Sequence, residues 1–292
     1  MNPCCTILMN DRAGRFKSTV STDEMSKLLK HLDLNIAVVG TKSEAHMIAV
    51  LKELVAKRAD RVALAGGDGT IHTAIQVLAG TQTSMGIVPQ GTQNNFATAL
   101  RLPQDLPSAL RTLIEGEPLP VDLGYGCGMY FAESAGVGLF ANALALYGAD
   151  ANKNLIRGMY AIFKIVTNLR ASRIRLTVDG ELINEPAVFC AAMNTYRFAQ
   201  SLPIAPSAKV TDGLLDVVVL GDLHRNELIG YYRAIRKQLH VMLPKTRIIQ
   251  AKSVKIESRR PLPVHVDDKI RGATPVTLEC RPGILKVIVE RL

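Results

Sequence analysis

The feature that most constrains the fold is a repeated alternation of apolar runs and helical patterns early in the chain. Runs at 35–39, 61–65 and 85–89 are apolar and predict buried strands. Residues 43–55 carry apolar side chains at helical spacing behind Ser43, a residue favoured at helix starts. Strands joined by helices run parallel, and ligands bind at the carboxyl ends of such strands. The sequence therefore predicts an α/β domain with a binding site at that edge.

Further segments extend this pattern on both sides. An apolar run at 6–9 predicts another strand, which ends in a turn-like stretch at 10–14. Helices are expected at 22–31 with Ser21 or Thr22 as cap, at 71–78, and at 106–115 with Pro107 in the first turn.

In the second part of the chain the predicted secondary structure differs, because short strand-like runs dominate. Asp179-Gly180 between two such runs is typical of a hairpin turn. Strands are expected at 130–132, 173–178, 187–192, 215–220, 253–257 and 264–266, and helices at 159–169 and 226–242. We predict an α/β domain over 1–122 and a β-rich domain over 123–292, whose tail is free to return to the first domain.

Composition narrows the class of protein. The chain has 292 residues, which suggests two domains at roughly 150 residues each. No apolar run reaches the roughly 18 residues that cross a bilayer, and the N-terminus lacks a signal-peptide pattern. The five cysteines show no metal or redox spacing, so we expect a reducing, cytoplasmic location. The net charge of +9, concentrated at 225–260, fits either a polyanionic partner or an ordinary solvated surface.

The first candidate ligand-binding loop is Gly66-Gly67-Asp68-Gly69-Thr70, which follows a predicted strand. Glycines allow phosphate to approach the backbone N–H groups at the start of a helix. An acidic residue there would repel phosphate unless a cation intervenes, so Asp68 indicates Mg²⁺. Thr70 is expected to cap the helix or to contact a phosphate.

A second loop, Gly91-Thr92-Gln93-Asn94-Asn95-Phe96-Ala97, follows the next strand. Neighbouring strands would place the two loops side by side, where both could hold one nucleotide. The Asn94 and Asn95 amides offer donors and acceptors to ribose or phosphate. Taken alone, this loop favours a simple helix cap at Asn94 or Asn95.

The ordered set of motifs resembles the diacylglycerol kinase catalytic-domain family, and its bacterial lipid-kinase branch most closely. The two loops carry the resemblance, together with Asn10 and Gly14, Val121-Asp122-Leu123-Gly124, Ala135-Gly136-Val137-Gly138 and Asp212-Gly213-Leu214-Leu215-Asp216. Sphingosine kinases are similar to this branch. The resemblance covers nearly the whole chain and implies an α/β nucleotide domain followed by a β-sandwich. NAD kinase and phosphofructokinase have similar glycine loops, but the second loop and the Asp212 motif favour the lipid kinases.

The resemblance also implies roles for individual residues. It implies ATP and Mg²⁺ as cofactors, with Asp68 organising the metal and phosphates. The nucleotide would be bordered by Asn10, Gly66, Gly67, Gly69, Thr70, Thr92, Asn94 and Asn95. A structural metal ion would be held by Asp212, Lys209 and Leu214 and tied to Asp122.

Two departures from the family pattern bear on catalysis. Asn95 stands where the family usually has Asp. Val266-Asp267-Asp268-Lys269 stands where it usually has Asp-Gly-Glu, whose Glu removes the proton from the lipid hydroxyl. Lys269 occupies the Glu position and is protonated at neutral pH, so Asp268 becomes the candidate base. The alternative is a homologue that binds nucleotide or lipid without efficient catalysis.

The partners expected from the resemblance are a lipid substrate and, transiently, an anionic membrane surface at the inner membrane face. The stretch 226–242 mixes apolar and basic residues and could lie on such a surface or pack on its own domain. Nucleic acid is not expected as a partner, and a homodimer is left open.

Overall fold

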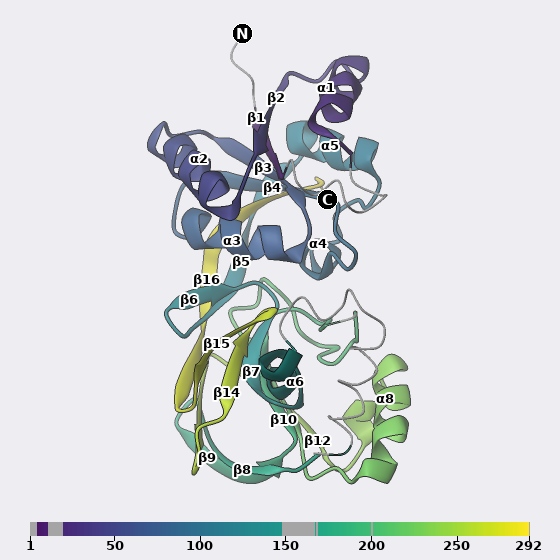
Figure 1. The fold of residues 1–292 in the computed structure, drawn as a ribbon, viewed down its shortest axis with the longest axis vertical. Coiled ribbons are helices and arrows are strands. Elements are labelled where there is room, and N and C mark those ends of the chain that lie inside the picture. The colour runs from purple at the N-terminus through teal and green to yellow at the C-terminus, as the bar shows by residue number, and fades with distance from the viewer. Residues whose placement is uncertain (1–4, 11–19, 148–166, 168, 200, 292) are drawn as a thin grey trace. The chain divides into compact units, whose positions relative to one another are not determined.

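The computed structural model describes residues 5–10, 20–147, 167, 169–199 and 201–291 (Figure 1). The chain divides into two compact units. Unit 1 comprises Met1–Val121 and Gly283–Leu292, and unit 2 comprises Asp122–Pro282. Two strands, β5 (Glu117–Gly126) and β16 (Val276–Val289), therefore contribute residues to both units.

Unit 1 is built on a parallel sheet, which confirms the predicted α/β architecture. Its strands follow the order β2-β1-β3-β4, with β4 also pairing in parallel with the end of β16 through Met85 and Val287. The strand bounds are β1 (Cys5–Asn10), β2 (Ile36–Thr41), β3 (Arg61–Gly66) and β4 (Ser84–Pro89).

Five helices are described in unit 1, and local capping explains where several of them begin. They are α1 (Thr22–His31), α2 (Glu44–Ala56), α3 (Asp68–Leu78), α4 (Asn95–Ala99) and α5 (Leu106–Glu115). Ser21 forms a capping box with Glu24 before α1, and Ser43 Oγ accepts from the His46 backbone N–H before α2. Asp105 caps α5, whose first turn contains Pro107 as predicted.

Helices cover both faces of this sheet. Met25 of α1 and Leu110 and Leu113 of α5 pack against Ile7 and Met9 of β1. In Figure 1, α2 and α3 lie on the opposite side of the strands from α1 and α5. Burial on both faces explains why the strands read as continuous apolar runs rather than alternating ones.

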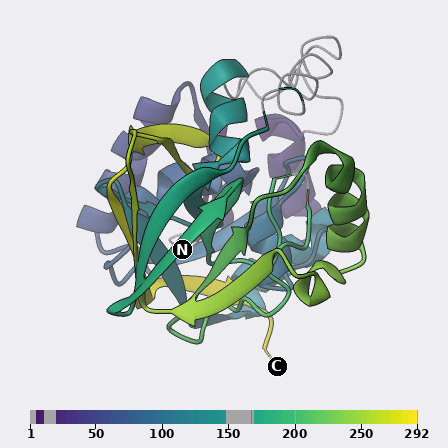
Figure 2. The same cartoon turned by 90° about the horizontal axis from the view of Figure 1, so that it is seen from below.

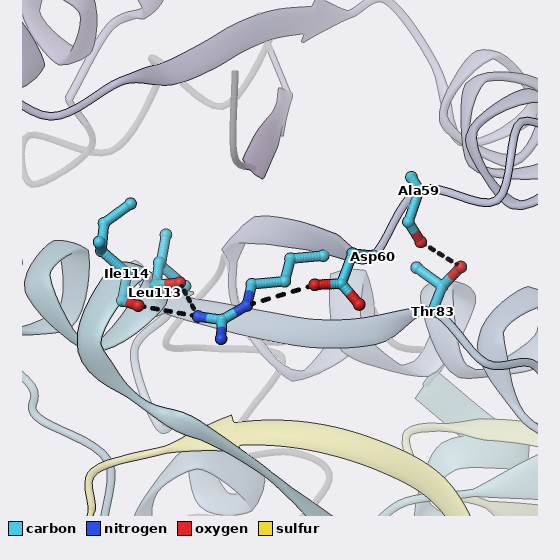
Figure 3. Close-up of polar contacts among 6 residues, drawn as sticks. Ala59, Asp60, Thr83, Leu113 and Ile114 are labelled. Carbon is cyan, nitrogen blue, oxygen red and sulfur yellow. Dashed lines mark hydrogen bonds and ion pairs between the residues drawn. The ribbon is translucent and has the colours of Figure 1, made fainter. Parts of the chain in front are cut away.

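Arg61 ties the end of α5 to the start of β3. Figure 3 labels its partners Leu113, Ile114 and Asp60. Its guanidinium Nη1 donates to the carbonyl oxygens of Leu113 at 2.8 Å and Ile114 at 3.0 Å. Asp60 lies 3.9 Å from its Nε. A cation at the carboxyl end of a helix stabilises the exposed carbonyls there, so this contact holds α5 at the edge of β3.

Unit 2 is a β-sandwich, as the family resemblance implied. Strands β16-β13-β8-β9 are one part of a ten-stranded sheet, and this four-stranded part is called the smaller sheet below. The larger sheet of unit 2 has six strands in the order β12-β11-β10-β7-β14-β15. The described strands are β6 (Met129–Phe131), β7 (Ser134–Gly138), β8 (Ser172–Val178), β9 (Glu181–Ala187), β10 (Phe189–Met193), β11 (Leu215–Leu220), β12 (Thr246–Ala251), β13 (Ser253–Ser258), β14 (Pro263–Val266) and β15 (Lys269–Ala273).

The sandwich core lies between these two sheets. Leu176 and Ile256 of the smaller sheet share one buried cluster with Val137, Val217 and Val264 of the larger sheet. On the other face of the larger sheet, residues such as Phe189 and Val218 form a second cluster with α8 (Leu228–Arg236). The larger sheet is therefore covered on both faces.

The predicted helix over 226–242 is wrong in its extent. A 3₁₀ turn (Arg225–Glu227) precedes α8, and a second one (His240–Met242) follows it. Gln238 adopts a left-handed backbone with φ 58°, which ends regular helix. The helix expected at 159–169 falls mostly outside the described residues. An unexpected helix, α6 (Leu139–Tyr147), follows β7.

None of the helices in the described part of the chain is both long enough and apolar enough to cross a lipid bilayer.

Candidate active site

The two glycine loops of unit 1 lie in direct backbone contact at the carboxyl ends of β3 and β4. Gly66 pairs with Pro89 in the sheet, and the Gln90 N–H donates to the Gly66 carbonyl at 3.0 Å. A Cβ added to Gly91 would lie 2.5 Å from Gly67 Cα, and one added to Gly67 would lie 2.9 Å from Gly91 Cα. Only glycine fits at both positions, so this close approach explains why both loops need it.

Asp68 links the two loops through its carboxylate. It is the first residue of α3, and its Oδ1 accepts from the backbone N–H of Phe96 at 3.4 Å. Phe96 belongs to α4, which begins at Asn95 directly after the second loop. The acidic side chain therefore stands where the starts of two helices meet, and positive partial charges of both helices favour it there.

Helix α3 begins at Asp68, three residues before the predicted start at 71. Gly67 is its N-cap, and the Thr70 N–H donates to the Gly67 carbonyl at 2.9 Å. Thr70 is therefore not the cap, and its side chain fills the space beside Gly66. A Cβ added to Gly69 would meet nothing within 4 Å, so the first turn of α3 is open on that side.

Asn94 shapes the second loop rather than extending from it. Its backbone is left-handed, with φ 49°. Its side-chain oxygen accepts from the Gly91 N–H at 2.9 Å, and its nitrogen donates to the Gly91 carbonyl at 3.0 Å. Asn95 is buried and Thr92 is exposed. Asn10 ends β1 of the same sheet, and its side chain lies outside the described part.

Gln90 directly precedes the second loop and was not predicted as a site residue. Both its amide atoms are buried, and neither finds a hydrogen-bond partner among the described residues. Buried amides without partners are costly, so this side chain is suited to a polar ligand. The available signal was a polar residue between the end of an apolar strand and a glycine loop.

In unit 2, Asp267 holds the start of β7 through three backbone N–H groups. Its carboxylate accepts from Ala132 at 3.1 Å, Glu133 at 2.9 Å and Ser134 at 3.1 Å. Its own N–H donates to the Ser134 carbonyl at 2.8 Å. Asp267 is thereby fully engaged in structure, a role the sequence analysis missed.

The two residues after Asp267 differ in exposure. Asp268 is exposed in the turn between β14 and β15, and Lys269 is half-buried at the start of β15. Val266 pairs with Lys269, so Asp267 and Asp268 form a two-residue turn. Asp268 is the more exposed of the two residues, since Asp267 is half-buried.

His265 is a buried histidine beside this turn. Its Nε2 lies 3.5 Å from Ser134 Oγ, and the rings of Phe140 and Phe198 pack against it. Burial lowers the pKa of His265 from 6.5 to about 4, although the Asp267 carboxylate opposes the shift. The imidazole is therefore neutral in the folded protein at neutral pH.

Asp122 and Asp212 lie around one turn of unit 2. Asp122 Oδ2 accepts from the Gly213 N–H at 2.7 Å, and Asp212 Oδ1 accepts from the Leu214 N–H at 3.0 Å. Burial, and then the carboxylates of Asp122 and Asp212, raise the pKa of the Cys280 thiol to about 12. This negative environment suits a cation.

No three His, Cys, Asp or Glu side chains converge as a metal site anywhere in the described ranges. Asp68, Asp122 and Asp212 therefore each need oxygen ligands other than acidic side chains to hold an ion.

The described chain thus combines a parallel α/β unit that carries paired glycine loops with a β-sandwich unit. Residues 5–125 match the family model of the diacylglycerol kinase catalytic domain. Residues 133–289 match that of the YegS C-terminal NAD kinase beta sandwich-like domain. The chain belongs to the diacylglycerol kinase catalytic-domain family, in its bacterial lipid-kinase branch.

Relatives match along most of the chain. In an alignment of 301 positions it is 29% identical to a diacylglycerol kinase of Mycobacterium tuberculosis (strain CDC 1551 / Oshkosh). The alignment covers 98% of this chain and 95% of the relative. A diacylglycerol kinase of Staphylococcus saprophyticus is 27% identical over 277 residues, which cover 92% of this chain and 90% of the relative.

Solved structures show the same fold. A putative diacylglycerol kinase from Bacillus anthracis str. Sterne has a TM-score of 0.77 at 23% identity, covering 98% of this chain and 96% of its own. An NAD kinase from Archaeoglobus fulgidus in complex with ATP has a TM-score of 0.51 at 14% identity, and the match covers 98% of this chain and 93% of that one.

Proposed function

We propose that this protein is an ATP-dependent lipid kinase that transfers the γ-phosphoryl group to the hydroxyl of diacylglycerol or a related lipid alcohol. The observation that carries the proposal is the pair of glycine loops in backbone contact, with Asp68 between them. Membership of the diacylglycerol kinase catalytic-domain family supports the choice of a lipid acceptor.

The open first turn of α3 is the proposed phosphate site. Backbone N–H groups at a helix start bind anions, and Gly69 leaves them approachable. The buried amide of Gln90 offers both a donor and an acceptor beside the same loops, which fits a nucleotide. Thr92, Asn94 and Asn95 would border that nucleotide, and Asn94 would act by fixing the loop.

The donor set at Asp68 fits Mg²⁺. This ion is usually held by one or two carboxylates with water and substrate phosphates, so a single carboxylate is sufficient. Bound Mg²⁺ neutralises charge that develops on the phosphate oxygens. In unit 2, Asp212 with the backbone of Lys209 and Leu214 would hold a structural cation near Asp122, since hard cations prefer oxygen ligands.

Asp268 is the proposed proton acceptor. The Asp267 carboxylate is occupied by three backbone N–H groups, and Lys269 carries the wrong charge for a base at neutral pH. Asp268 is exposed and adjacent in the same turn. Phosphoryl transfer depends mostly on positioning and charge neutralisation, so a modest base is compatible with activity.

The proposal is tested by incubating the protein with γ-labelled ATP, Mg²⁺ and diacylglycerol in mixed micelles and measuring label in the lipid extract. We expect transfer by the native protein and a loss of about a hundredfold or more in Asp68→Ala, because its carboxylate organises the phosphates. Asp23→Ala is the matched control, since Asp23 is also acidic and lies in the first turn of a unit 1 helix. Equal rates in the two variants would refute the assigned role.

A second candidate function is a homologue that binds nucleotide or lipid but transfers phosphate poorly, which Lys269 favours. Lys269→Glu restores the family's carboxylate, and a positioned base contributes about 10²- to 10⁴-fold. If the missing base limits the native protein, Lys269→Glu raises the rate at least about tenfold, whereas Lys269→Gln does not. No transfer to any lipid alcohol in native protein or variant, despite ATP binding, would favour this second function.

A further inference from the structure

The exposed large apolar side chains of the described residues gather in one short segment. Six such side chains are exposed, and five lie between residues 229 and 242. Their exposed fractions are 65% for Ile229, 53% for Tyr232, 56% for Leu239, 44% for Val241 and 81% for Met242. Scattered exposed apolar residues are ordinary, but a concentration of this kind marks an interaction surface.

The segment belongs to α8 and the 3₁₀ turn after it. Leu228, Tyr231 and Ile235 form the inner face of α8 and pack into the second apolar cluster of unit 2. Positions 229, 232, 233 and 236 are spaced by three and four residues, so they share the outer face. Figure 2 shows α8, in green, on the outer side of the strands. The helix is anchored by one face and presents the other.

Cations are interleaved with these apolar residues. We call the outer surface formed by Ile229, Tyr232, Arg233, Arg236, Lys237, Leu239, Val241 and Met242 the α8 surface. Its three basic side chains are exposed and have no carboxylate partner among the described residues. The nearby Glu227 carboxylate is already paired with Lys245 at 2.6 Å. The α8 surface is thus apolar and positively charged at once.

Charge decides between two occupants of such a surface. A symmetric pairing of two copies would bring the same patch of each chain together and place like charges against one another. An anionic lipid surface instead attracts Arg and Lys, while apolar and aromatic side chains enter the headgroup region. The composition of the α8 surface therefore favours a membrane over a second copy of the chain.

We propose that the α8 surface docks this protein on an anionic lipid bilayer. Ile229, Leu239 and Met242 insert among the lipid headgroups and upper acyl chains, and Arg233, Arg236 and Lys237 bind lipid phosphates. The biological purpose of this docking rests on the proposed function, because a lipid acceptor resides in a bilayer. Docking itself requires neither ATP nor an acceptor.

The experiment measures co-sedimentation with vesicles that mix phosphatidylglycerol with phosphatidylcholine, without ATP. Each cation near an anionic surface contributes about 1 kcal/mol, so Arg233→Gln/Arg236→Gln weakens binding about 30-fold. Leu239→Ser/Met242→Ser removes inserted carbons and weakens binding about tenfold or more. Added salt weakens native binding through screening, and pure phosphatidylcholine binds poorly.

Matched controls keep the result specific. Leu182→Ser removes an exposed leucine elsewhere, at 59% exposure, and Arg111→Gln removes an exposed cation of unit 1. Both controls should bind vesicles like the native protein. All variants should keep the native melting temperature, since none alters a buried side chain. Native binding in the α8-surface variants, or equal losses in the controls, would overturn the proposal.

Two further outcomes separate the alternatives. A dimer in light scattering that dissociates in Leu239→Ser/Met242→Ser, without vesicle binding, would make the α8 surface a contact between copies and reject the membrane. Phosphorylation of a dispersed short-chain diacylglycerol reports on the proposed function alone. Activity there without vesicle binding defeats only the docking inference, and vesicle binding without activity defeats only the proposed function.

Discussion

Replacing Asp267 tests how the turn between β14 and β15 holds unit 2 together. Its carboxylate accepts three backbone N–H groups at 2.9–3.1 Å, from residues that are buried in the fold. Hydrogen bonds to a charged group contribute about 1.5–3 kcal/mol each, and partial access to water reduces their sum. We therefore expect Asp267→Ala to lower the free energy of unfolding by about 3–5 kcal/mol, a large share of the usual 5–15 kcal/mol.

The arrangement of the three bonds predicts a graded series. Glu133 and Ser134 donate to Oδ1, whereas Ala132 donates to Oδ2. Asp267→Asn can keep the Oδ1 bonds and should cost only about 1–2 kcal/mol. Asp267 has φ 49°, a conformation that Gly adopts without strain, so Asp267→Gly should fall between Asn and Ala.

Urea denaturation followed by circular dichroism measures the series, because the free energy of unfolding falls linearly with urea. The order of stability should be native, Asn, Gly, Ala. An Asp267→Ala protein within about 0.5 kcal/mol of the native one, the range of ordinary surface substitutions, would refute the role of the carboxylate.

Two other predictions follow from single side chains. His265 has its pKa lowered to about 4 by burial, so the unfolded chain takes up a proton that the folded protein refuses. Between pH 6.5 and pH 4, the free energy of unfolding of the native protein should fall by about 3 kcal/mol more than that of His265→Gln. Urea unfolding midpoints measured across this pH range test the difference. Curves that run parallel for the two proteins would contradict it. Gly69→Ala should raise stability slightly, because its Cβ meets nothing within 4 Å, while weakening ATP binding in calorimetry by blocking approach to α3. Unchanged ATP affinity would argue against a phosphate site there.

Elements with local signals could be predicted from the sequence. Ser21 and Ser43 are caps whose hydrogen bonds stay within one turn, so the starts of α1 and α2 were predictable. The predicted start of α3 was late because residues 66–70 were assigned to a loop, whereas Asp68 already begins the helix.

Features that depend on distant residues could not be predicted in this way. Strand β16 was missed because Pro282 and Gly283 interrupt its apolar pattern, while its neighbours in both units hold it extended. The Asp267 contacts join residues more than 130 positions apart, so no local spacing reveals them.

In the proposed site, too, some features were predictable from the local sequence and others depend on the fold. Gly67 and Gly91 were identifiable because each follows a strand that ends at the same edge of a parallel sheet. Their backbone contact and the bond from Phe96 to Asp68 emerge only in three dimensions. Gln90 was missed because the burial of its amide is a property of the fold.

The central claim is that the contacting glycine loops hold a metal-bound triphosphate. A crystal structure of the protein with Mg²⁺ and a non-hydrolysable ATP analogue tests it most directly. We expect phosphate density at the first turn of α3, with the cation on Asp68 and the Gln90 amide hydrogen-bonded to the nucleotide. Nucleotide bound elsewhere in a well-ordered crystal, with these loops closed by the protein's own side chains, would contradict it.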